Sequence, residues 1–435
     1  MKRFSAFFLS LVFLFGLTGC SPAITAPSAP PTPLKFWCSI PYEDGPRQLV
    51  EDFNRTHPEI EVQYIYYAND TLGNDRLDKA LDMEGDVDLC LSSARSNLVR
   101  RAEAGWLLPL NPLLTRREVD VESLYGPGAE LFRLRDMLYS LPSRLFNQCI
   151  LYNKEMFLDH GVPLPRAGWT YEEFLDAATQ LSSETVYGYF SSQVEHGEPA
   201  LAFLRAQLGP DWMYSEDGSG VWIDRPEVKY ALEQYLLRTE SGIEPDFTDN
   251  KTQRMCTEDL FLRGQAAMVM DRWTVRHVKD LERYPHDFQV GFATVPRLGG
   301  AEQDQLYTSV YSDDISIAAS TLFPEEAMTF LMWYVNEGVH WLTPKGLIPC
   351  TVQISPADTA AALFAGSESL FDLNSVREVY LISQTARTPR YFTAIQEIQS
   401  ILGQEFEKAF TGFCTVDEAL AAAQSRANAA FEESK

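Results

Sequence analysis

A tryptophan stands just beyond a short apolar run that has the length of a buried strand. The run is Ala266–Met270, and Trp273 follows it after Asp271 and Arg272. Gly264, ahead of the run, signals the end of a helix, because glycine adopts the left-handed backbone of a C-cap without steric cost. Ligands of open α/β sheets bind beyond strand ends, and an aromatic face can stack on them there. Trp273 is therefore a candidate binding residue, with a place in the core as the alternative.

Two other predicted strands are also followed by side chains that could contact a ligand. Tyr42 and Glu43 lie in the loop after the first strand, and Ser93 and Arg95 follow the apolar run 87–91. An arginine at a strand end can donate to hydroxyls or to an anion. The alternatives are an ordinary polar turn for the first pair and an ion pair with an acidic neighbour for Arg95.

Motifs of covalent or metal chemistry do not occur in the sequence. It has no Gly-x-Ser-x-Gly, no His-Glu-x-x-His and no P-loop, and its six histidines are scattered. Acidic residues are abundant, yet no two stand out as the carboxylate pair of a glycosidase. We therefore predict no catalytic residue, no metal site and no cofactor.

The elements that position these residues follow from local patterns. Apolar residues alternate over 34–38 and again over 60–66, and Pro46 opens a helix between them. This order predicts a β-α-β unit with parallel strands. Two capping boxes, Thr170 with Glu173 and Thr415 with Glu418, predict the starts of later helices.

Charge and leader indicate an exported protein. The formal net charge is −25, which argues against binding to nucleic acid or to anionic lipid headgroups. Lys2 and Arg3 precede an apolar stretch that is too short for a comfortable membrane span. Leu17-Thr18-Gly19-Cys20 then looks like a bacterial lipobox, which implies a lipid on Cys20. The Pro- and Ala-rich segment up to residue 34 reads as a disordered tether.

Six further cysteines are spread widely and form no Cys-x-x-Cys pair. Their placement in apolar runs favours buried free thiols. Cys38 and Cys90 are the one pair that adjacent strands would bring close enough for a disulfide.

The order of the motifs resembles extracellular solute-binding proteins, family 1, the carbohydrate-type receptors of ABC importers. The Gly-Gln-Ala-Ala-Met turn at 264–268 with its following strand and Trp273 carries part of the resemblance. The stretch from Tyr152-Asn153-Lys154 through Gly161 to Trp169-Thr170 carries the most. Looser matches lie, in family order, at 49–62, 87–91 with 105–110, 290–296, 346–349 and 415–422.

The resemblance implies an α/β, two-lobe periplasmic-binding-protein-like fold of type II. Each lobe is then a mainly parallel sheet flanked by helices, and a hinge joins the two. The expected division is a signal peptide over 1–19, a tether over 20–34, an N-terminal lobe from 35–141 plus 296–348, and a C-terminal lobe from 142–295 plus 349–435.

The resemblance also implies binding positions. To Tyr42, Glu43, Ser93, Arg95 and Trp273 it adds Asn147 and the loop with Tyr311, Asp313 and Asp314. The two aspartates stand where small residues are usual in the family. We expect them to bind sugar hydroxyls or to select a basic group.

The expected function is that of a lipid-anchored, monomeric receptor on the outer face of a bacterial cell membrane. It would capture a sugar or oligosaccharide by hinge closure and deliver it to the permease of an ABC importer. The alternatives are a surface-anchored glycosidase-like enzyme and a ligand-sensing lipoprotein without a transport role.

Overall fold

The predicted β-α-β unit opens the first sheet. Strand β1 (Thr32–Cys38) pairs in parallel with β2 (Ile60–Tyr66), and α1 (Pro46–Thr56) connects them. Pro46 starts the helix, and Leu49, Val50 and Phe53 are buried against the sheet. The structure is a computed structural model that describes residues 30–126, 129–134, 136–192, 198–209, 211–215, 217–270, 274–298, 309–380 and 394–434.

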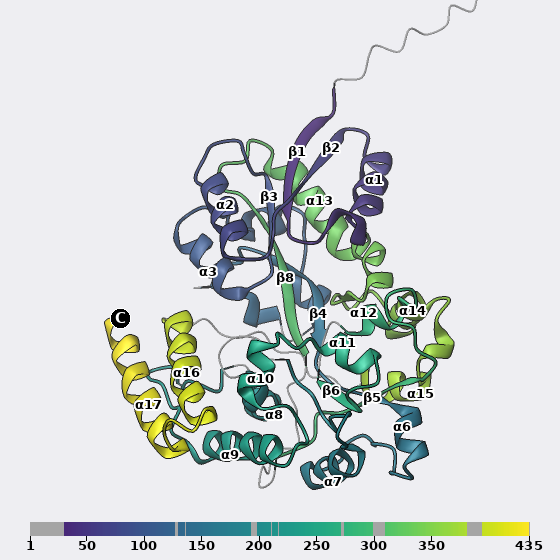
Figure 1. Ribbon diagram of the computed structural model, residues 1–435. Coiled ribbons are helices and arrows are strands. Elements are labelled where there is room, and N and C mark those ends of the chain that lie inside the picture. The colour runs from purple at the N-terminus through teal and green to yellow at the C-terminus, as the bar shows by residue number, and fades with distance from the viewer. Residues whose placement is uncertain are drawn as a thin grey trace, which may run out of the picture.

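The first lobe is built around a six-stranded sheet in the order β2-β1-β3-β8-β4-β9 (Figure 1). Its remaining strands are β3 (Leu89–Ser92), β4 (Leu141–Asn147), β8 (Ser309–Ile317) and β9 (Ile348–Pro349). Its helices are α2 (Thr71–Leu81), α3 (Arg95–Glu103), α4 (Asn111–Arg116), α5 (Val121–Tyr125) and α13 (Pro324–Asn336), with short turns η1 (Tyr42–Asp44), η2 (Ala129–Phe132), η3 (Gly338–Trp341) and η4 (Thr343–Lys345).

The second lobe is built around a three-stranded sheet in the order β6-β5-β7. These strands are β6 (Met268–Met270), β5 (Ile150–Asn153) and β7 (Val290–Ala293). Around them lie α6 (Lys154–Asp159), α7 (Tyr171–Leu181), α8 (Glu198–Leu208), α9 (Pro226–Glu240), α10 (Phe247–Thr252), α11 (Thr257–Leu262), α12 (Thr274–Val278), α14 (Pro356–Phe364), α15 (Leu373–Ser375), α16 (Ile395–Phe410) and α17 (Val416–Glu433), with the short 3₁₀ helix η5 (Glu368–Leu370) and the π-helix η6 (Val376–Tyr380).

The α/β class is confirmed, but the expectation of mainly parallel sheets is wrong. Among the named strands only β1 pairs in parallel, with β2 and with β3. Strand β8 is antiparallel to both β3 and β4, and β5 is antiparallel to both of its neighbours. The chain leaves the first sheet along β4 and returns to it along β8, so these two strands must run in opposite directions.

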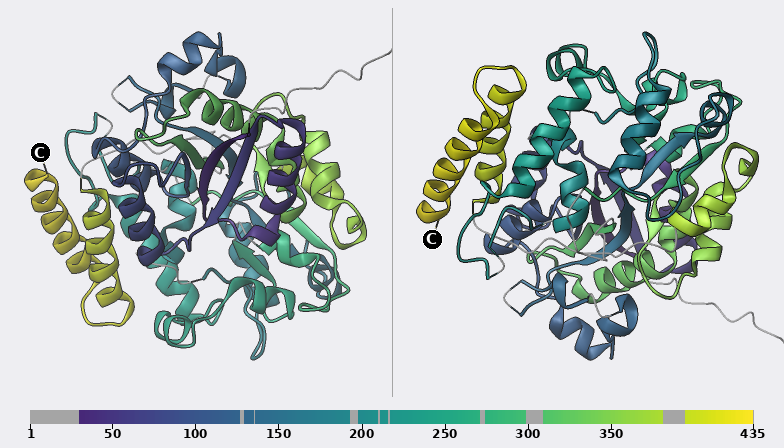
Figure 2. Two further views of the ribbon diagram at one scale, coloured as in Figure 1. Left: turned by 90° about the horizontal axis from the view of Figure 1, so that it is seen from above. Right: turned by 90° about the horizontal axis from the view of Figure 1, so that it is seen from below.

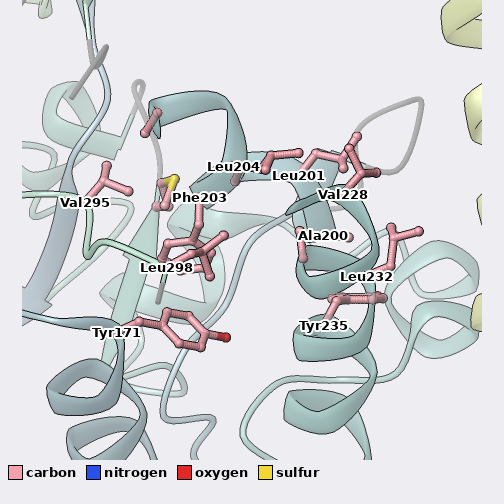
Figure 3. Close-up of a cluster of buried hydrophobic side chains, with 14 of the residues drawn as sticks. Tyr171, Ala200, Leu201, Phe203, Leu204, Val228, Leu232, Tyr235, Val295 and Leu298 are labelled. Carbon is pink, nitrogen blue, oxygen red and sulfur yellow. The ribbon is translucent and has the colours of Figure 1, made fainter. Parts of the chain in front are cut away.

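Separate cores fill the lobes. In the first lobe, Phe36 and Cys38 belong to the cluster on one face of the sheet and Trp37 to the cluster on the other. In the second lobe, α7, α8 and α9 contribute Tyr171, Phe203 and Leu232 to one large cluster (Figure 3). Helices α16 and α17 pack side by side on the flank of this lobe (Figures 1 and 2).

Several local predictions are confirmed by the helix ends. Both capping boxes form, Thr170 with Glu173 and Thr415 with Glu418. Helix α11 ends at Leu262, and Gly264 beyond it adopts a φ of 72°. Within the part of the chain that the structure describes, no helix is both long and apolar enough to cross a membrane.

The six cysteines outside the leader are free thiols, as predicted, and Cys38, Cys90, Cys149 and Cys350 are buried. The suggested bridge between Cys38 and Cys90 is absent although their strands are neighbours. Cys90 stands opposite Trp37 in the register, so Cys38 points to the other face of the sheet.

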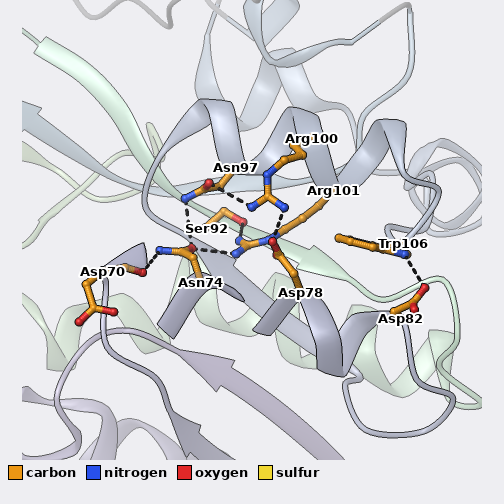
Figure 4. A network of polar contacts seen from close by, with 9 residues as sticks. All are labelled: Asp70, Asn74, Asp78, Asp82, Ser92, Asn97, Arg100, Arg101 and Trp106. Atoms are coloured by element: carbon orange, nitrogen blue, oxygen red, sulfur yellow. Dashed lines mark hydrogen bonds and ion pairs between the residues drawn. The ribbon is translucent and has the colours of Figure 1, made fainter. Parts of the chain in front are cut away.

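A buried arginine ties α2 and α3 to the end of β3 (Figure 4). Arg101 is fully buried and donates to Asp78 Oδ1 at 2.7 Å, to Ser92 Oγ at 2.6 Å and to Asn74 Oδ1 at 2.8 Å. Arg100 also pairs with Asp78, but its side chain is largely exposed. The network holds Ser92, the last residue of β3, and thereby positions Ser93, which follows it.

Removal of the buried arginine should therefore cost far more than removal of the exposed one. We expect Arg101→Met to lower the free energy of unfolding by about 3 kcal/mol, because it leaves buried polar groups without their donor. The control Arg100→Ala should cost less than about 1 kcal/mol, as exposed ion pairs do. Urea unfolding of both variants measures the difference, and equal losses would contradict a buried network.

Candidate functional site

A cleft of about 950 Å³ lies where the two lobes face each other. Its walls are formed by strand ends of the first lobe and by α12 with the turn after it in the second lobe. The described lining consists of Ser39, Ile40, Pro41, Asp44, Asn69, Ser93, Arg144, Asp313, Pro344, Lys345 and Leu347 from the first lobe and Arg276, His277, Lys279, Asp280 and Arg283 from the second. The carboxyl ends of β1, β2 and β3 thus open into this cleft, as expected for an open sheet.

Serine hydroxyls line the first-lobe wall. The hydroxyls of Ser39, after β1, and Ser93, after β3, lie 3.0 Å apart and share a hydrogen bond. Ser312 of β8 donates to the backbone oxygen of Ser93 at 3.3 Å. Parallel pairing of β1 with β3 brings the two hydroxyls together, so Ser93 belongs to the cleft lining, and its contact with a ligand stays a prediction.

A buried ion pair forms the base of the cleft. Arg144 of β4 pairs with Asp313 of β8, and both side chains are almost completely inaccessible. Burial raises the pKa of Asp313, and the charge of Arg144 with hydrogen bonds from Ser93 and Ser312 opposes that rise. Asp313 adopts a φ of 53°, a left-handed conformation that an aspartate tolerates better than most residues. Asp313 therefore lines the cleft with its charge already compensated.

Asp314 and Arg95 form an ion pair with each other and do not belong to the described cleft lining. Ser140 Oγ donates to Asp314 Oδ1 at 2.8 Å, and Arg95 Nη1 lies 3.8 Å from the same oxygen. Arg95 also donates to the backbone oxygen of Phe132 at 2.8 Å. Burial raises the pKa of Asp314, and Arg95 opposes this. Neither residue belongs to the described cleft lining, and the arrangement is the ion-pair alternative weighed for Arg95.

Tyr42 and Glu43 are also absent from the described lining, although Pro41 and Asp44 on either side of them belong to it. The Tyr42 ring packs against Tyr64 with 5.3 Å between centroids, and the Arg47 guanidinium lies 5.5 Å from the Tyr42 ring centre. Glu43 is exposed and pairs with Arg47.

Three predicted contacts cannot be placed by their side chains. Trp273 lies outside the described residues, between β6 and α12. Asn147 and Tyr311 are described in their backbones alone, toward the same end of the pairing between β4 and β8, where Asn147 stands opposite Ser309 and Leu145 opposite Tyr311. These three remain predictions.

The sequence interpretation missed the basic residues of the cleft. Arg144 lies in β4, and Arg276, Lys279 and Arg283 stand three to ten residues after Trp273. Lys345 arrives from η4, far along the chain. Proximity to Trp273 was the available signal for the 276–283 group, whereas nothing local marked Lys345.

The arrangement is suited to binding rather than to catalysis. Hydroxyls, charged groups and backbone atoms at strand ends surround a cleft of about 950 Å³, and both lobes contribute to its walls. Within the described residues, no three His, Cys, Asp or Glu side chains are grouped as a metal site.

Neutralisation of Asp313 should expose the cost of the buried arginine beneath the cleft. We expect Asp313→Asn to lower the free energy of unfolding by about 3 kcal/mol, since Arg144 then keeps a buried charge without its partner. The control Asp44→Asn, at a half-buried lining position without a described ion pair, should cost less than about 1 kcal/mol. Urea denaturation compares the two, and a loss in Asp313→Asn as small as in the control would contradict a compensated buried pair.

Two curated proteins align with most of this chain, and a solved structure superimposes on it. A mannitol-binding protein of Pseudomonas aeruginosa is 24% identical over 87% of this chain and 88% of its own. An uncharacterized lipoprotein of Streptomyces antibioticus is 27% identical over 74% of this chain and 70% of its own. The crystal structure of a sugar transporter from Rhizobium etli in an open conformation superimposes with a TM-score of 0.76 at 18% identity, covering 92% of this chain and 99% of that one.

The family model of the bacterial extracellular solute-binding proteins matches residues 41–341, more than half of the chain. The match confirms the resemblance seen in the motifs, and it includes the cleft lining except Ser39, Ile40, Pro344, Lys345 and Leu347. The chain therefore belongs to the bacterial extracellular solute-binding protein family, and it is a binding protein rather than the glycosidase-like enzyme that its many acidic residues left open.

Proposed function

We propose that this protein captures a sugar or oligosaccharide in the cleft between its lobes and delivers it to an ABC permease. The observation that carries the proposal is the cleft itself, which is lined from both lobes and opens at the strand ends of the first. A ligand that contacts both walls favours the arrangement in which they lie close together, and this couples binding to lobe closure.

Sugar as the ligand class rests on the named relatives and on the lining. The Pseudomonas aeruginosa relative is named for mannitol, a polyol, and the Rhizobium etli structure is named a sugar transporter. Ser39, Ser93 and Asn69 offer hydroxyl and amide groups that match polyol hydroxyls. Trp273 would add a ring face for the C–H surface of a sugar, at the entry to α12.

We further propose the lobe limits and the anchor that the sequence suggests. The N-terminal lobe would comprise 35–141 with 296–348, and the C-terminal lobe 142–295 with 349–435, so that β4 is the crossing strand, whose residues beyond 141 still pair with β8 of the first sheet. Leu145 packs on core residues of both lobes, which supports a crossing close to β4. A lipid on Cys20 would anchor the protein, as a monomer, to the outer face of the bacterial cell membrane. The relative that is named a lipoprotein supports the lipid anchor.

A thermal-shift panel of monosaccharides, polyols and oligosaccharides tests the proposal on the full chain. At least one sugar should raise the melting temperature, because a ligand at a hundred times its Kd stabilises the folded state by about 2.7 kcal/mol. Trp273→Ala should abolish the shift with little change in the melting temperature of the free protein.

The matched control is Trp222→Ala, which removes a half-exposed tryptophan that lies outside the described cleft lining. This variant should keep the full shift. If Trp273→Ala binds the sugar unchanged, Trp273 is a core residue and not a ligand contact. If no sugar of the panel raises the melting temperature, sugar is rejected as the ligand class.

A further inference from the structure

The cleft has a charge opposite to that of the chain. The whole protein carries a formal net charge of −25. The described lining nevertheless holds five basic residues, Arg144, Arg276, Lys279, Arg283 and Lys345, against the three acidic residues Asp44, Asp280 and Asp313. Acidic residues outnumber basic ones in the whole chain, 61 to 36, so the excess of basic residues is a local property of the cleft.

Internal pairing compensates only part of this charge. Arg144 is matched by Asp313 at the base of the cleft. Asp280 accepts a hydrogen bond from the backbone nitrogen of Arg283 at 3.1 Å, which holds the turn after α12, and its negative charge offsets one of the remaining cations. Within the described residues, no carboxylate lies within 4 Å of the charged nitrogens of Lys279, Arg283 or Lys345.

Elements of both lobes bring these cations together. Lys279 Nζ donates to the backbone oxygen of Pro344 at 3.3 Å, so it reaches across to η4 beside Lys345. Gly346 lies so close to Arg276 that a β-carbon on it would stand 3.1 Å from Cβ of the arginine. The positive wall of α12 therefore meets η4 directly, and Lys345 stands at their junction.

The pKa of Lys279 is lowered in this surrounding. Burial lowers its pKa to about 8, the carboxylate of Glu368 in η5 opposes the fall, and the charge of Lys345 adds to it. Arg276 Nε donates to Nε2 of His277 on the same wall at 3.1 Å, so this ring nitrogen acts as an acceptor, and a Glu258 carboxylate oxygen lies 3.7 Å from it. A ligand anion between these groups would relieve the repulsion and form charge-assisted hydrogen bonds with them.

We propose that the sugar bound in this cleft carries an anionic group, a carboxylate or a phosphate, and that Lys279, Arg283 and Lys345 hold it. The proposal rests on the proposed function, because it names the class of sugar rather than a separate site. An anion raises the pKa of Lys279 on binding, so the complex takes up protons. Affinity for such a sugar should then fall as the pH rises through about 8, where the free protein loses the Lys279 charge.

Matched ligand pairs test the proposal by titration calorimetry on the full chain at low and moderate salt. Glucose, galactose and mannose are compared with their uronic acids and with their 6-phosphates, and neutral oligosaccharides with oligogalacturonides. We expect at least one acidic member to bind ten-fold or more tightly than its neutral counterpart, and added salt to narrow the gap. The two acidic arms tell carboxylate from phosphate, and inorganic phosphate alone should bind at least ten-fold more weakly than the preferred sugar.

Charge-removing variants locate the effect. Arg283→Gln and Lys345→Gln should each reduce the preference for the acidic sugar at least five-fold and leave the weak binding of the neutral one unchanged. Arg263→Gln and Lys79→Gln remove exposed cations outside the described lining and should keep the preference. Lys279→Met should flatten the pH dependence of affinity between pH 7 and pH 9.

The outcomes separate the two proposals. If a neutral sugar binds as tightly as its acidic counterpart, and the Arg283 and Lys345 variants do not alter its affinity, the anionic-sugar proposal is overturned while sugar capture stands. If inorganic phosphate alone matches the best sugar phosphate, the site is an anion site and the sugar part is wrong. If no sugar of either kind binds, the proposed function fails and this inference fails with it.

Discussion

The antiparallel pairing of β4 with β8 is the constraint on which the rest of the structure depends. β4 takes the chain toward the second lobe, and β8 returns it to the centre of the first sheet. The ion pair of Arg144 with Asp313 fastens the two strands where solvent is excluded, and Ser143 Oγ donates to the Asp313 carbonyl at 2.9 Å. A broken pair leaves a buried charge, so the two strands are held together at the point where the lobes meet.

Features encoded in neighbouring residues were predictable from the sequence, and features made by distant residues were not. The β-α-β unit, the helix end at Gly264 and both capping boxes follow from spacings of a few residues. The insertion of β8 between β3 and β4 does not, because strand order is decided by pairing across more than a hundred residues. The site divides in the same way: Ser93 and Asp313 line the cleft, whereas Arg95 and Asp314 neutralise each other. The partner of Glu43, Arg47, was visible at a spacing of four.

Long-range and short-range electrostatics act in opposite directions in this protein. A net charge of −25 repels an approaching anion, but at physiological salt that repulsion is screened over about 8 Å. A group bound in the cleft lies within this screening distance of Lys279, Arg283 and Lys345, so these three cations contribute most to the potential that it experiences. The acidic surface therefore governs solubility and encounter rate, and the lining governs affinity.

The same balance gives lobe closure a physical driving force. The cations after α12 and in η4 already meet at one edge of the cleft, where Lys279 Nζ donates to the Pro344 carbonyl at 3.3 Å, so without a ligand their mutual repulsion opposes a tighter approach there. An anionic group placed between them reverses the sign of that term and binds the closed arrangement more tightly than the open one. A ligand shifts a conformational equilibrium only by its difference in affinity for the two states, and a group that contacts both walls maximises this difference. A neutral sugar of the same size would lack the electrostatic part, so specificity and closure would arise from the same few side chains.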